Sequence, residues 1–471
     1  MADESIPRDV PGGVPRQGSV SSSHVQFQGE LASAETCTVM NFLGYGPYIR
    51  QARRDAYKEC GRLLTAQSRD GSTWIIAGSK AEGLTSYLES DRDYISVVKG
   101  VICLEEGVDS STIPGETNIL RSCSRLSYPG HCRLLLERFG TTASIQFTEA
   151  LCDDGYGRLF LSSDLYVNAC SDVKHTEDVV VHERAGPSTP STLAKDLHTD
   201  LVHALHFYCP GIVTRWATRH RNWPTPNVVQ EVVSLGALVT PVGMKGSDYE
   251  HVEWRMCFNT AESVLVQNLN DTQVKLYVLL KMVKKDVLKP RKKEFTSFTM
   301  KNIVLWIAEN NQQLLFHERS LIHWLHEGLD ALRVAIDKRE LPYYIIPERN
   351  LMAACDLDNE QQRAWIATIN ELIEEGPRII LRLPKIRRAI IAHPEPLRWH
   401  SGMKIEMEML ELIKMYRAAL GVDMETDIIY QVAKRRQHEI ASEVNLEWIM
   451  DWRSTGDLVI DLNYAYTSLL M

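Results

Sequence analysis

The spacing of apolar residues predicts a long helix near the start of the chain. From residue 35 to residue 64, apolar side chains recur at three- and four-residue steps, as on one face of an amphipathic helix. Gly44, Gly46 and Pro47 interrupt this spacing, so we expect a break or restart near Pro47. Residues 1–32 are rich in Pro, Gly, Ser and Gln and are expected to be flexible, because they bury too little apolar surface to offset their ordering entropy.

Short apolar runs separated by Gly, Ser, Asp and Pro follow the helix and are typical of β-strands. These runs are 74–77, 94–98, 134–136, 143–147 and 178–182. From about residue 201 the spacing becomes helical. The helical segments include 261–287, 300–310, 314–336, 359–375 and 404–420. The pattern therefore predicts an α/β lobe at 33–235, a helical lobe at 236–350 and a helical C-terminal extension at 351–471.

The composition restricts the class of protein. Apolar residues make up 44% of the 471 positions and charged residues 24%, which is typical of soluble globular proteins. There is no apolar run of about 18 residues and no signal-peptide pattern at the N-terminus. The ten cysteines lack any CxxC pair and are expected to be reduced thiols. We therefore expect a cytoplasmic protein without a membrane segment, with a nuclear location as an alternative.

The net charge of -9 argues against non-specific coating of nucleic acid, which requires clustered Lys and Arg. Local basic clusters remain candidates for a ligand surface, although such clusters are more often solvated helix faces. The clusters are Arg50, Arg53, Arg54, Lys58 and Arg62; Lys284, Lys285, Lys289, Arg291, Lys292 and Lys293; and Lys385, Arg387 and Arg388.

The most informative chemistry lies between the first two predicted strands. The first strand ends in Gly78-Ser79, and the second opens with Asp91-Arg92-Asp93. Because side chains alternate along a strand, both aspartates point to the same side, about 7 Å apart, where they could hold divalent ions. Gly78 allows close approach of a phosphate, and Ser79 offers a donor to it. This arrangement indicates metal-dependent phosphoryl transfer. The alternative is a plain turn followed by a solvated strand start.

Two features of this site stay open at the level of sequence. Glu89 precedes Asp91 by two residues and could share its face. A third carboxylate is expected from a neighbouring strand, because two metal ions need more than two ligands. Asp200, which apolar residues follow directly, is the best candidate, and Asp164 and Asp196 are alternatives.

In this order, these elements resemble the catalytic signature of the cyclic GMP-AMP synthase-like receptors and the related male-abnormal developmental proteins. Further motifs recur in the family's order, and the resemblance spans residues 35 to 350. They are GPS at 186–188, WATRHRNWP at 216–224, LVTPVG at 238–243, EWRMCFNTAE at 253–262 and TSFTMK at 296–301. The resemblance implies an α/β plus α fold: a bilobed, polymerase-beta-like nucleotidyltransferase core with a mixed sheet, and a helical second lobe that completes the cleft.

The resemblance also implies roles for single residues. Asp91, Asp93 and Asp200 would bind Mg²⁺ or Mn²⁺, while Gly78 and Ser79 would cradle the triphosphate of the donor nucleotide.

Arg255 would contact the acceptor base. Two serines of the family's stretch are replaced here by Cys257 and Asn259, which leaves the second base open. The base-stacking tyrosine of the family corresponds to Phe298 after Ser297, and phenylalanine keeps the ring face. From its own surroundings in the sequence, Phe298 would more often be a core residue.

Lys281 corresponds to a phosphate-binding lysine of the family, with Lys284 or Lys285 as alternatives. The zinc-binding insertion of the DNA-sensing members, with one His and three Cys, has no counterpart between Glu262 and Lys281. We therefore expect no zinc.

The function that the resemblance implies is synthesis of a cyclic dinucleotide second messenger in innate antiviral signalling. The substrates would be ATP and a second NTP (GTP, UTP or ATP), and the product would act on a downstream receptor. Without the zinc insertion, double-stranded RNA is the expected activator, held between the basic residues from Arg50 to Arg62 and the cluster at 284–293. Oligomerisation on ligand binding stays open. The alternatives are a catalytically silent protein of the same fold that binds a nucleotide or a partner, and an enzyme that extends RNA tails.

Overall fold

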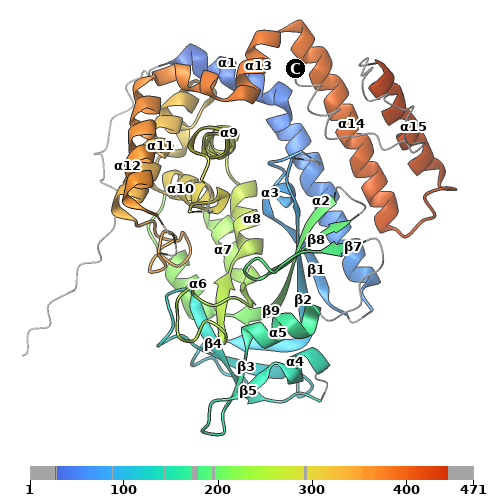
Figure 1. The fold of residues 1–471 in the computed structure, drawn as a ribbon, viewed down its shortest axis with the longest axis vertical. Helices are drawn as coiled ribbons and strands as arrows, with labels where there is room; N and C mark the ends of the chain where they lie inside the picture. Colours follow the sequence, from blue (N-terminus) through green and yellow to red (C-terminus); the bar gives the residue numbers. More distant parts are fainter. Residues whose placement is uncertain are drawn as a thin grey trace, which may run out of the picture.

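The computed structural model describes residues 27, 29–69, 71–86, 89–141, 144–171, 179–193, 197–290, 294–353, 355 and 357–443. Strands occupy the centre and lower part of the molecule in Figure 1, and helices α9 (Asp271–Met282) to α12 (Asn359–Glu374) lie above them. The long helix α14 (Glu395–Ala419) runs beside α2 (Pro47–Gln67). Among the described residues, no helix is both long enough and apolar enough to cross a lipid bilayer.

The N-terminal helix is interrupted where the sequence predicts it. Helix α1 (Glu30–Met40) continues into the π-helical turn η1 (Asn41–Tyr45), and α2 (Pro47–Gln67) follows. Gly44 has a φ of 84°, which L-residues with a side chain rarely adopt, and Pro47 occupies the first turn of α2. The predicted break near Pro47 is confirmed. The predicted flexible segment, 1–32, lies largely outside the described residues, although Phe27 is buried.

The strands form one sheet in the order β1-β2-β3-β4-β11-β10-β9-β8-β7, with β5 and β6 attached beside β4. Strand β2 pairs antiparallel with β1 and parallel with β3 and β9, so the sheet is mixed. The strands are β1 (Thr73–Ala77), β2 (Arg92–Leu104), β3 (Asn118–Cys123), β4 (His131–Arg138), β5 (Leu151–Asp153), β6 (Leu159–Leu161), β7 (Val179–Val181), β8 (Ser188–Leu193), β9 (Leu197–Tyr208), β10 (Ala237–Thr240) and β11 (Glu253–Cys257).

Helices flank the sheet and make up most of the chain after β11. Within the first half they are α3 (Gly78–Ala81), α4 (Ile145–Glu149), α5 (Ser163–Ser171), α6 (Pro210–Ala217) and α7 (Pro226–Leu235). The later ones are α8 (Asn259–Gln267), α9 (Asp271–Met282), η2 (Val283–Leu288), α10 (Ser297–Asn310), η3 (Gln313–Leu315), η4 (Glu318–Ser320), α11 (Leu321–Lys338), α12 (Asn359–Glu374), η5 (Gly376–Arg382), α13 (Pro384–Ala392), α14 (Glu395–Ala419) and α15 (Ile428–Glu443).

Two predictions about elements are wrong. The described part of the run 143–147, residues 144–147, is not a strand: Ser144 accepts a hydrogen bond from the Phe147 amide and caps the short helix α4. The helical pattern does not begin at residue 201, because β9 runs to Tyr208. Strands β10 and β11 belong to the same sheet, so the sheet extends past the predicted boundary at residue 235.

One hydrophobic core joins the sheet to the helical region, and the C-terminal extension contributes to it. Trp254 of β11 and Leu329 of α11 lie in this core, together with Ile386 and Leu397 of the extension. A second cluster, which includes Tyr57 and Leu412, packs α14 against α2. All ten cysteines are free thiols, as predicted. The extension is therefore packed onto the domains that precede it.

Candidate active site

The fold brings Asp93 and Asp200 together. Both lie on central strands of the sheet, β2 and β9, and they are direct neighbours in the parallel register of that pair. On the other side of β2, Asp93 faces Ala77, the last residue before Gly78. Asp200 accepts a 2.9 Å hydrogen bond from Ser188, the serine of the GPS motif. Asp200 therefore lies on the strand beside Asp93, and its role as the third metal-binding carboxylate stays a prediction.

The carboxylates crowd one another. Burial raises the pKa of Asp93 to about 7, and the neighbouring charges of Asp200, Asp91 and Glu82 act in the same direction. Lys301 opposes this shift only in part. Asp91 directly precedes β2 and is exposed, whereas Asp93 lies within β2 and is half-buried. A concentration of negative charge at the edge of a sheet is the environment that a divalent cation would relieve.

The donor set suits hard divalent ions, because Asp91, Asp93 and Asp200 all offer carboxylate oxygens. As the side chains are placed, no group of three or more His, Cys, Asp or Glu among the described residues is gathered closely enough to hold a metal ion. The negative charge around Asp93 suits a bound cation. The carboxylate oxygens of the described residues, as their side chains are placed, do not form a complete set of metal ligands.

Gly78 lies against the Asp93 carboxylate. A Cβ atom on Gly78 would stand 1.9 Å from Oδ2 of Asp93, and the φ of Gly78 is 71°. Both observations require glycine at this position. The sequence suggested Gly78 for the approach of a phosphate, and the structure adds a second reason, the approach of the carboxylate itself.

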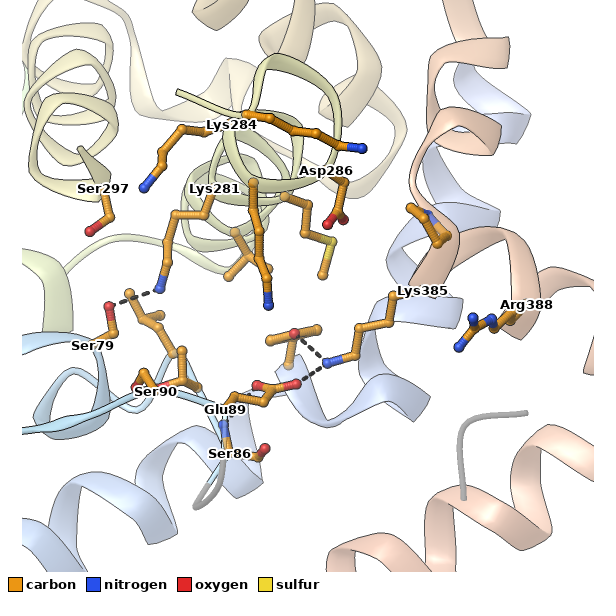
Figure 2. A pocket seen from close by; sticks show the side chains of 18 of the residues that line it. Ser79, Ser86, Glu89, Ser90, Lys281, Lys284, Asp286, Ser297, Lys385 and Arg388 are labelled. Atoms are coloured by element: carbon orange, nitrogen blue, oxygen red, sulfur yellow. Dashed lines mark hydrogen bonds and ion pairs between the residues drawn. The ribbon is translucent and has the colours of Figure 1, made fainter. Parts of the chain in front are cut away.

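Ser79 and Lys281 meet although they are far apart in the sequence. The Lys281 ammonium donates a 2.8 Å hydrogen bond to the Ser79 hydroxyl. Burial lowers the pKa of Lys281 to about 8. Figure 2 shows Ser79, Lys281, Lys284 and Ser297 converging on one space. Of the lysines considered from the sequence, Lys281 is the one that contacts Ser79.

That space is a cavity of about 840 Å³, which we name the basic cavity. It is lined by Tyr45, Ser79, Leu84, Thr85, Ser86, Glu89, Ser90, Val278, Lys281, Met282, Lys284, Lys285, Asp286, Lys289, Pro290, Ser297, Pro384, Lys385, Arg388 and Lys404.

A buried ionic network behind the aspartates was missed by sequence reasoning. Lys301 lies 2.5 Å from Glu82 and 3.1 Å from Glu262, and the hydroxyl of Tyr343 donates a 2.6 Å hydrogen bond to Glu262. Glu82 follows Gly78 by four residues, and Lys301 ends the TSFTMK motif. The signal that could have revealed this ionic network in the sequence was one charged residue in or beside each motif, Glu82 after Gly78-Ser79 and Lys301 in TSFTMK. The network fixes α3 to α8 and α10, so it holds the Gly78-Ser79 turn in place.

Phe298 is half-buried beside this network. Its ring centroid lies 5.6 Å from that of Tyr343, and the Lys301 ammonium lies 5.7 Å from the Phe298 ring. Its neighbour Ser297 lines the basic cavity, whereas Phe298 does not. Phe298 thus has protein contacts on one side, and its role as a platform for a base stays a prediction.

Arg255 lies on β11 between Thr240 of β10 and His131 of β4. Burial and the charges of Arg349 and Arg255 lower the pKa of His131 to about 3. Burial and the charge of Arg255 also lower the pKa of Arg349. The guanidinium groups of Arg255 and Arg349 therefore lie close enough to influence each other. Arg255 has no acidic partner within the described residues.

The other candidate carboxylates take different partners. Glu89 forms an ion pair with Lys385 and accepts a hydrogen bond from the Ser86 amide, so its carboxylate is engaged away from Asp93 (Figure 2). Asp164 lies on α5 and forms a 2.8 Å ion pair with Arg184. Asp196 lies outside the described residues.

Two of the five basic residues predicted to form a nucleic-acid surface are buried. Arg50 pairs with Asp271 at 2.9 Å, and its side chain is 6% exposed. Arg53 pairs with Glu408 at 2.7 Å, and its side chain is 1% exposed. The prediction that both belong to a ligand surface is wrong, because each cation is committed to a carboxylate of a neighbouring helix.

The remaining basic residues divide between the surface and the basic cavity. Lys58 and Arg62 are exposed, and Arg54 is half-buried. Lys284, Lys285 and Lys289 line the basic cavity, as do Lys385 and Arg388, whereas Arg387 is exposed outside it. The residues 291–293 of the predicted cluster lie outside the described residues.

Two protein families match the chain. Residues 162–268 match the Mab-21 protein nucleotidyltransferase domain, and residues 272–370 match the Mab-21 protein HhH/H2TH-like domain. No curated protein matches the chain. Asp200 and Arg255 fall in the first match and Lys281, Ser297 and Phe298 in the second, whereas Gly78, Ser79, Asp91 and Asp93 precede both. The extension after residue 370 follows both.

Proposed function

We propose that this chain, which contains a Mab-21 nucleotidyltransferase domain followed by a Mab-21 helical domain, is an active nucleotidyltransferase. The observation that carries the proposal is the juxtaposition of two elements. Asp93 and Asp200 are neighbours on parallel strands, and the turn that packs against Asp93 places Ser79 in contact with Lys281. A carboxylate pair beside a serine and lysine suits a nucleotide whose phosphates lie between them.

The reaction we propose is nucleotidyl transfer between two nucleoside triphosphates. A ribose hydroxyl of the acceptor loses its proton to solvent, and its oxygen forms a bond to the α-phosphorus of the donor. The bond from that phosphorus to the bridging oxygen breaks, and pyrophosphate leaves. A second transfer within the linear product closes the ring. Mg²⁺ or Mn²⁺ held by Asp91, Asp93 and Asp200 would lower the barrier by stabilising the hydroxyl oxygen and the leaving pyrophosphate.

The chain's own residues supply the rest of the proposed chemistry. Ser79 and Lys281 would bind the phosphates of the donor, since a lysine ammonium and a hydroxyl are both donors to phosphate oxygens. Ser188 orients Asp200 through its hydrogen bond. Arg255, which lacks an acidic partner among the described residues, is available to the acceptor base. The proposed product is a cyclic dinucleotide made from ATP and a second NTP, in innate immune signalling.

The activating ligand belongs to the proposal as well. We propose double-stranded RNA, which is bound largely through its backbone and shape. Exposed basic side chains on α2, Lys58 and Arg62, would contact it. Because Arg50 and Arg53 are buried, this surface is narrower than the sequence predicts.

Product formation tests the proposal directly. The purified chain is incubated with labelled ATP, GTP and UTP and with Mg²⁺ or Mn²⁺, with and without double-stranded RNA. We expect a phosphatase-resistant dinucleotide that disappears in the Asp93→Asn, Asp200→Asn double variant. Elongated RNA would instead indicate a tailing enzyme. A product that survives in the double variant would refute the assigned site.

The second candidate function is a catalytically silent protein of the same fold. The observation that favours it is the absence, within the described residues, of three side chains gathered to hold a metal ion. Nucleotide binding without product under every ligand condition, and without dependence on Asp93 and Asp200, would support this candidate.

A further inference from the structure

The C-terminal extension forms one wall of the basic cavity. One side is lined by Ser79, residues 84–86, Glu89 and Ser90, and a second by α9 and η2. The third is lined by Pro384, Lys385, Arg388 and Lys404 of α13 and α14. Figure 2 shows Lys385 and Arg388 reaching toward the space from the side that faces Ser79 and Lys281. This third wall lies outside both family matches, which end at residues 268 and 370.

The lining of the basic cavity is strongly cationic in a chain whose net charge is -9. Its acidic members are Glu89 and Asp286. Its cationic members are Lys281, Lys284, Lys285, Lys289, Lys385, Arg388 and Lys404. Like charges repel when they line one cavity, so this arrangement raises the energy of the folded chain unless an anion shares the space.

Lys404 is the clearest sign of a built anion site. Its side chain is 2% exposed, yet it has no hydrogen bond or ion pair to the residues that the structure describes. Burial and the charge of Lys385 lower the pKa of Lys404 to about 7. A lysine that is almost fully buried and has no hydrogen-bonded partner among the described residues is costly, and this one lines a cavity that an anion could enter.

Glu89, on the first wall, already gives one cation of the third wall an intramolecular counter-ion. It pairs with Lys385, which also donates a 2.7 Å hydrogen bond to the Tyr45 hydroxyl. This single ion pair neutralises only one of the cations that line the cavity, so the cavity as a whole favours negative charge.

We propose that the basic cavity binds a polyphosphate anion and that Arg388 and Lys404 of the C-terminal extension hold it from the side facing Ser79 and Lys281. Several linked phosphates match several cations around one space better than a single carboxylate does. The anion has two sources: the triphosphate of a nucleotide, which rests on the proposed function, or a separate multiply phosphorylated small molecule, which does not.

Titration calorimetry of the full chain with sodium tripolyphosphate, at fixed ionic strength and without metal, tests the proposal. The key comparison is Arg388→Gln against Arg387→Gln. Both arginines are exposed on α13, and of the two, Arg388 lines the cavity. We expect Arg388→Gln to weaken binding about three- to fivefold and Arg387→Gln to change it less than about twofold.

Lys404→Gln is the second variant, and we expect a loss of about tenfold or more because the buried ammonium binds its partner without competing water. Lys434→Gln, an exposed lysine of α15, is its control. If Lys404→Gln does not fold, the comparison of tripolyphosphate binding by Arg388→Gln and Arg387→Gln tests the proposal by itself. Absence of binding by the unmodified chain, or equal binding by it and both extension variants, would overturn the proposal.

Two further arms identify the source of the anion. ATP and inositol hexakisphosphate replace tripolyphosphate in the same titrations. If Arg388→Gln weakens ATP binding, the nucleotide supplies the polyphosphate; if only the hexakisphosphate is affected, the ligand is a separate molecule. The Asp93→Asn, Asp200→Asn variant is expected to keep tripolyphosphate binding. A chain that binds tripolyphosphate but makes no product would therefore reject the proposed function and support this inference.

Discussion

Gly78 shows how one residue decides the geometry of the candidate site. Its missing Cβ leaves room for the Asp93 carboxylate, and its backbone lies in the left-handed region at a φ of 71°. The turn that follows presents Ser79 to Lys281. A side chain at Gly78 would therefore push the carboxylate and the phosphate-binding turn apart together.

We expect Gly78→Ala to lower the free energy of unfolding by about 2–4 kcal/mol, from the strained backbone and from the clash with Asp93. Urea unfolding measures this loss. Gly246→Ala is the matched control, because Gly246 has a φ of 83° but a Cβ there would meet nothing within 4 Å. Gly246→Ala should cost only about 1 kcal/mol. Equal losses in the two variants would show that the contact with Asp93 is unimportant.

Lys404 makes the stability of the chain depend on pH. Its pKa is lowered to about 7 by burial and Lys385, with Arg53 in the same direction and Glu89 and Glu408 opposing. In the unfolded chain a lysine titrates near about 10.4. Between these values the unfolded chain binds a proton that the folded chain does not, so the stability contributed at Lys404 rises with pH across that window.

We expect Lys404→Met to stabilise the chain more at about pH 7 than at about pH 9, because the variant removes a charge whose burial is costly at the lower pH. Chemical unfolding at both pH values, in a buffer without phosphate, measures the difference. Lys434→Met controls for loss of an exposed lysine. A stability difference between Lys404→Met and the unmodified chain that is the same at both pH values would contradict the assigned environment.

At the scale of elements, α2 and α14 are clamped by a buried ion pair. Arg53 donates two hydrogen bonds to Glu408, and further hydrogen bonds to the carbonyls of Gly44 and Gly83. The guanidinium thus ties the extension to the helix break at η1 and to the turn after α3. This position explains why Arg53 cannot serve as a surface contact.

We expect Glu408→Gln to lower the free energy of unfolding by about 3–5 kcal/mol, because it leaves the Arg53 cation buried and incompletely paired. Arg53→Met, Glu408→Gln should lose less than the sum of the two single variants, which a double-mutant cycle in urea would show. Glu59→Gln removes the exposed partner of Arg62 on the same helix and should change stability little. Strict additivity would mean that the two side chains do not interact.

The sequence predicts helices and strands well where the spacing of apolar residues is clear. It fails where pairing between strands determines whether a segment is a helix or a strand. The break at Pro47 follows from Gly44 and Pro47 alone. By contrast, Leu201, Ala204 and Leu205 of β9 recur at helical steps, and only pairing with β2, β8 and β10 makes the segment a strand. The aspartates of the candidate site were identified because strand alternation is local.

Long-range contacts account for what the sequence did not predict in the site. The Glu82–Lys301 pair and the Lys281–Ser79 bond join segments about 200 residues apart, and Glu89 lies 296 residues from Lys385. Only the family resemblance linked Lys281 to the site. No motif linked Lys404 or Arg388 to it, since both lie in the extension, beyond the residues that the resemblance covers.

For the whole molecule, the extension changes which surfaces remain for a large ligand. Helix α14 packs along α2, where Tyr57 and Cys60 meet Leu412 and Met415. The face of α2 that the sequence offered to nucleic acid is therefore partly occupied by protein. What remains exposed on α2 is the side that carries Lys58 and Arg62.

If double-stranded RNA binds the exposed side of α2, its affinity should depend on Lys58 and on the salt concentration. Each phosphate contact that is lost should lower the slope of log affinity against log salt by about one. We expect Lys58→Gln to weaken binding of double-stranded RNA and to reduce the slope by about that amount. Lys338→Gln, which removes an exposed lysine at the end of α11, should leave both unchanged. Fluorescence anisotropy over a salt series gives the affinities. If the unmodified chain shows no RNA binding even at low salt, double-stranded RNA is not the activator. If it binds but Lys58→Gln has the same slope, the RNA lies on another face and α2 serves only to carry the extension.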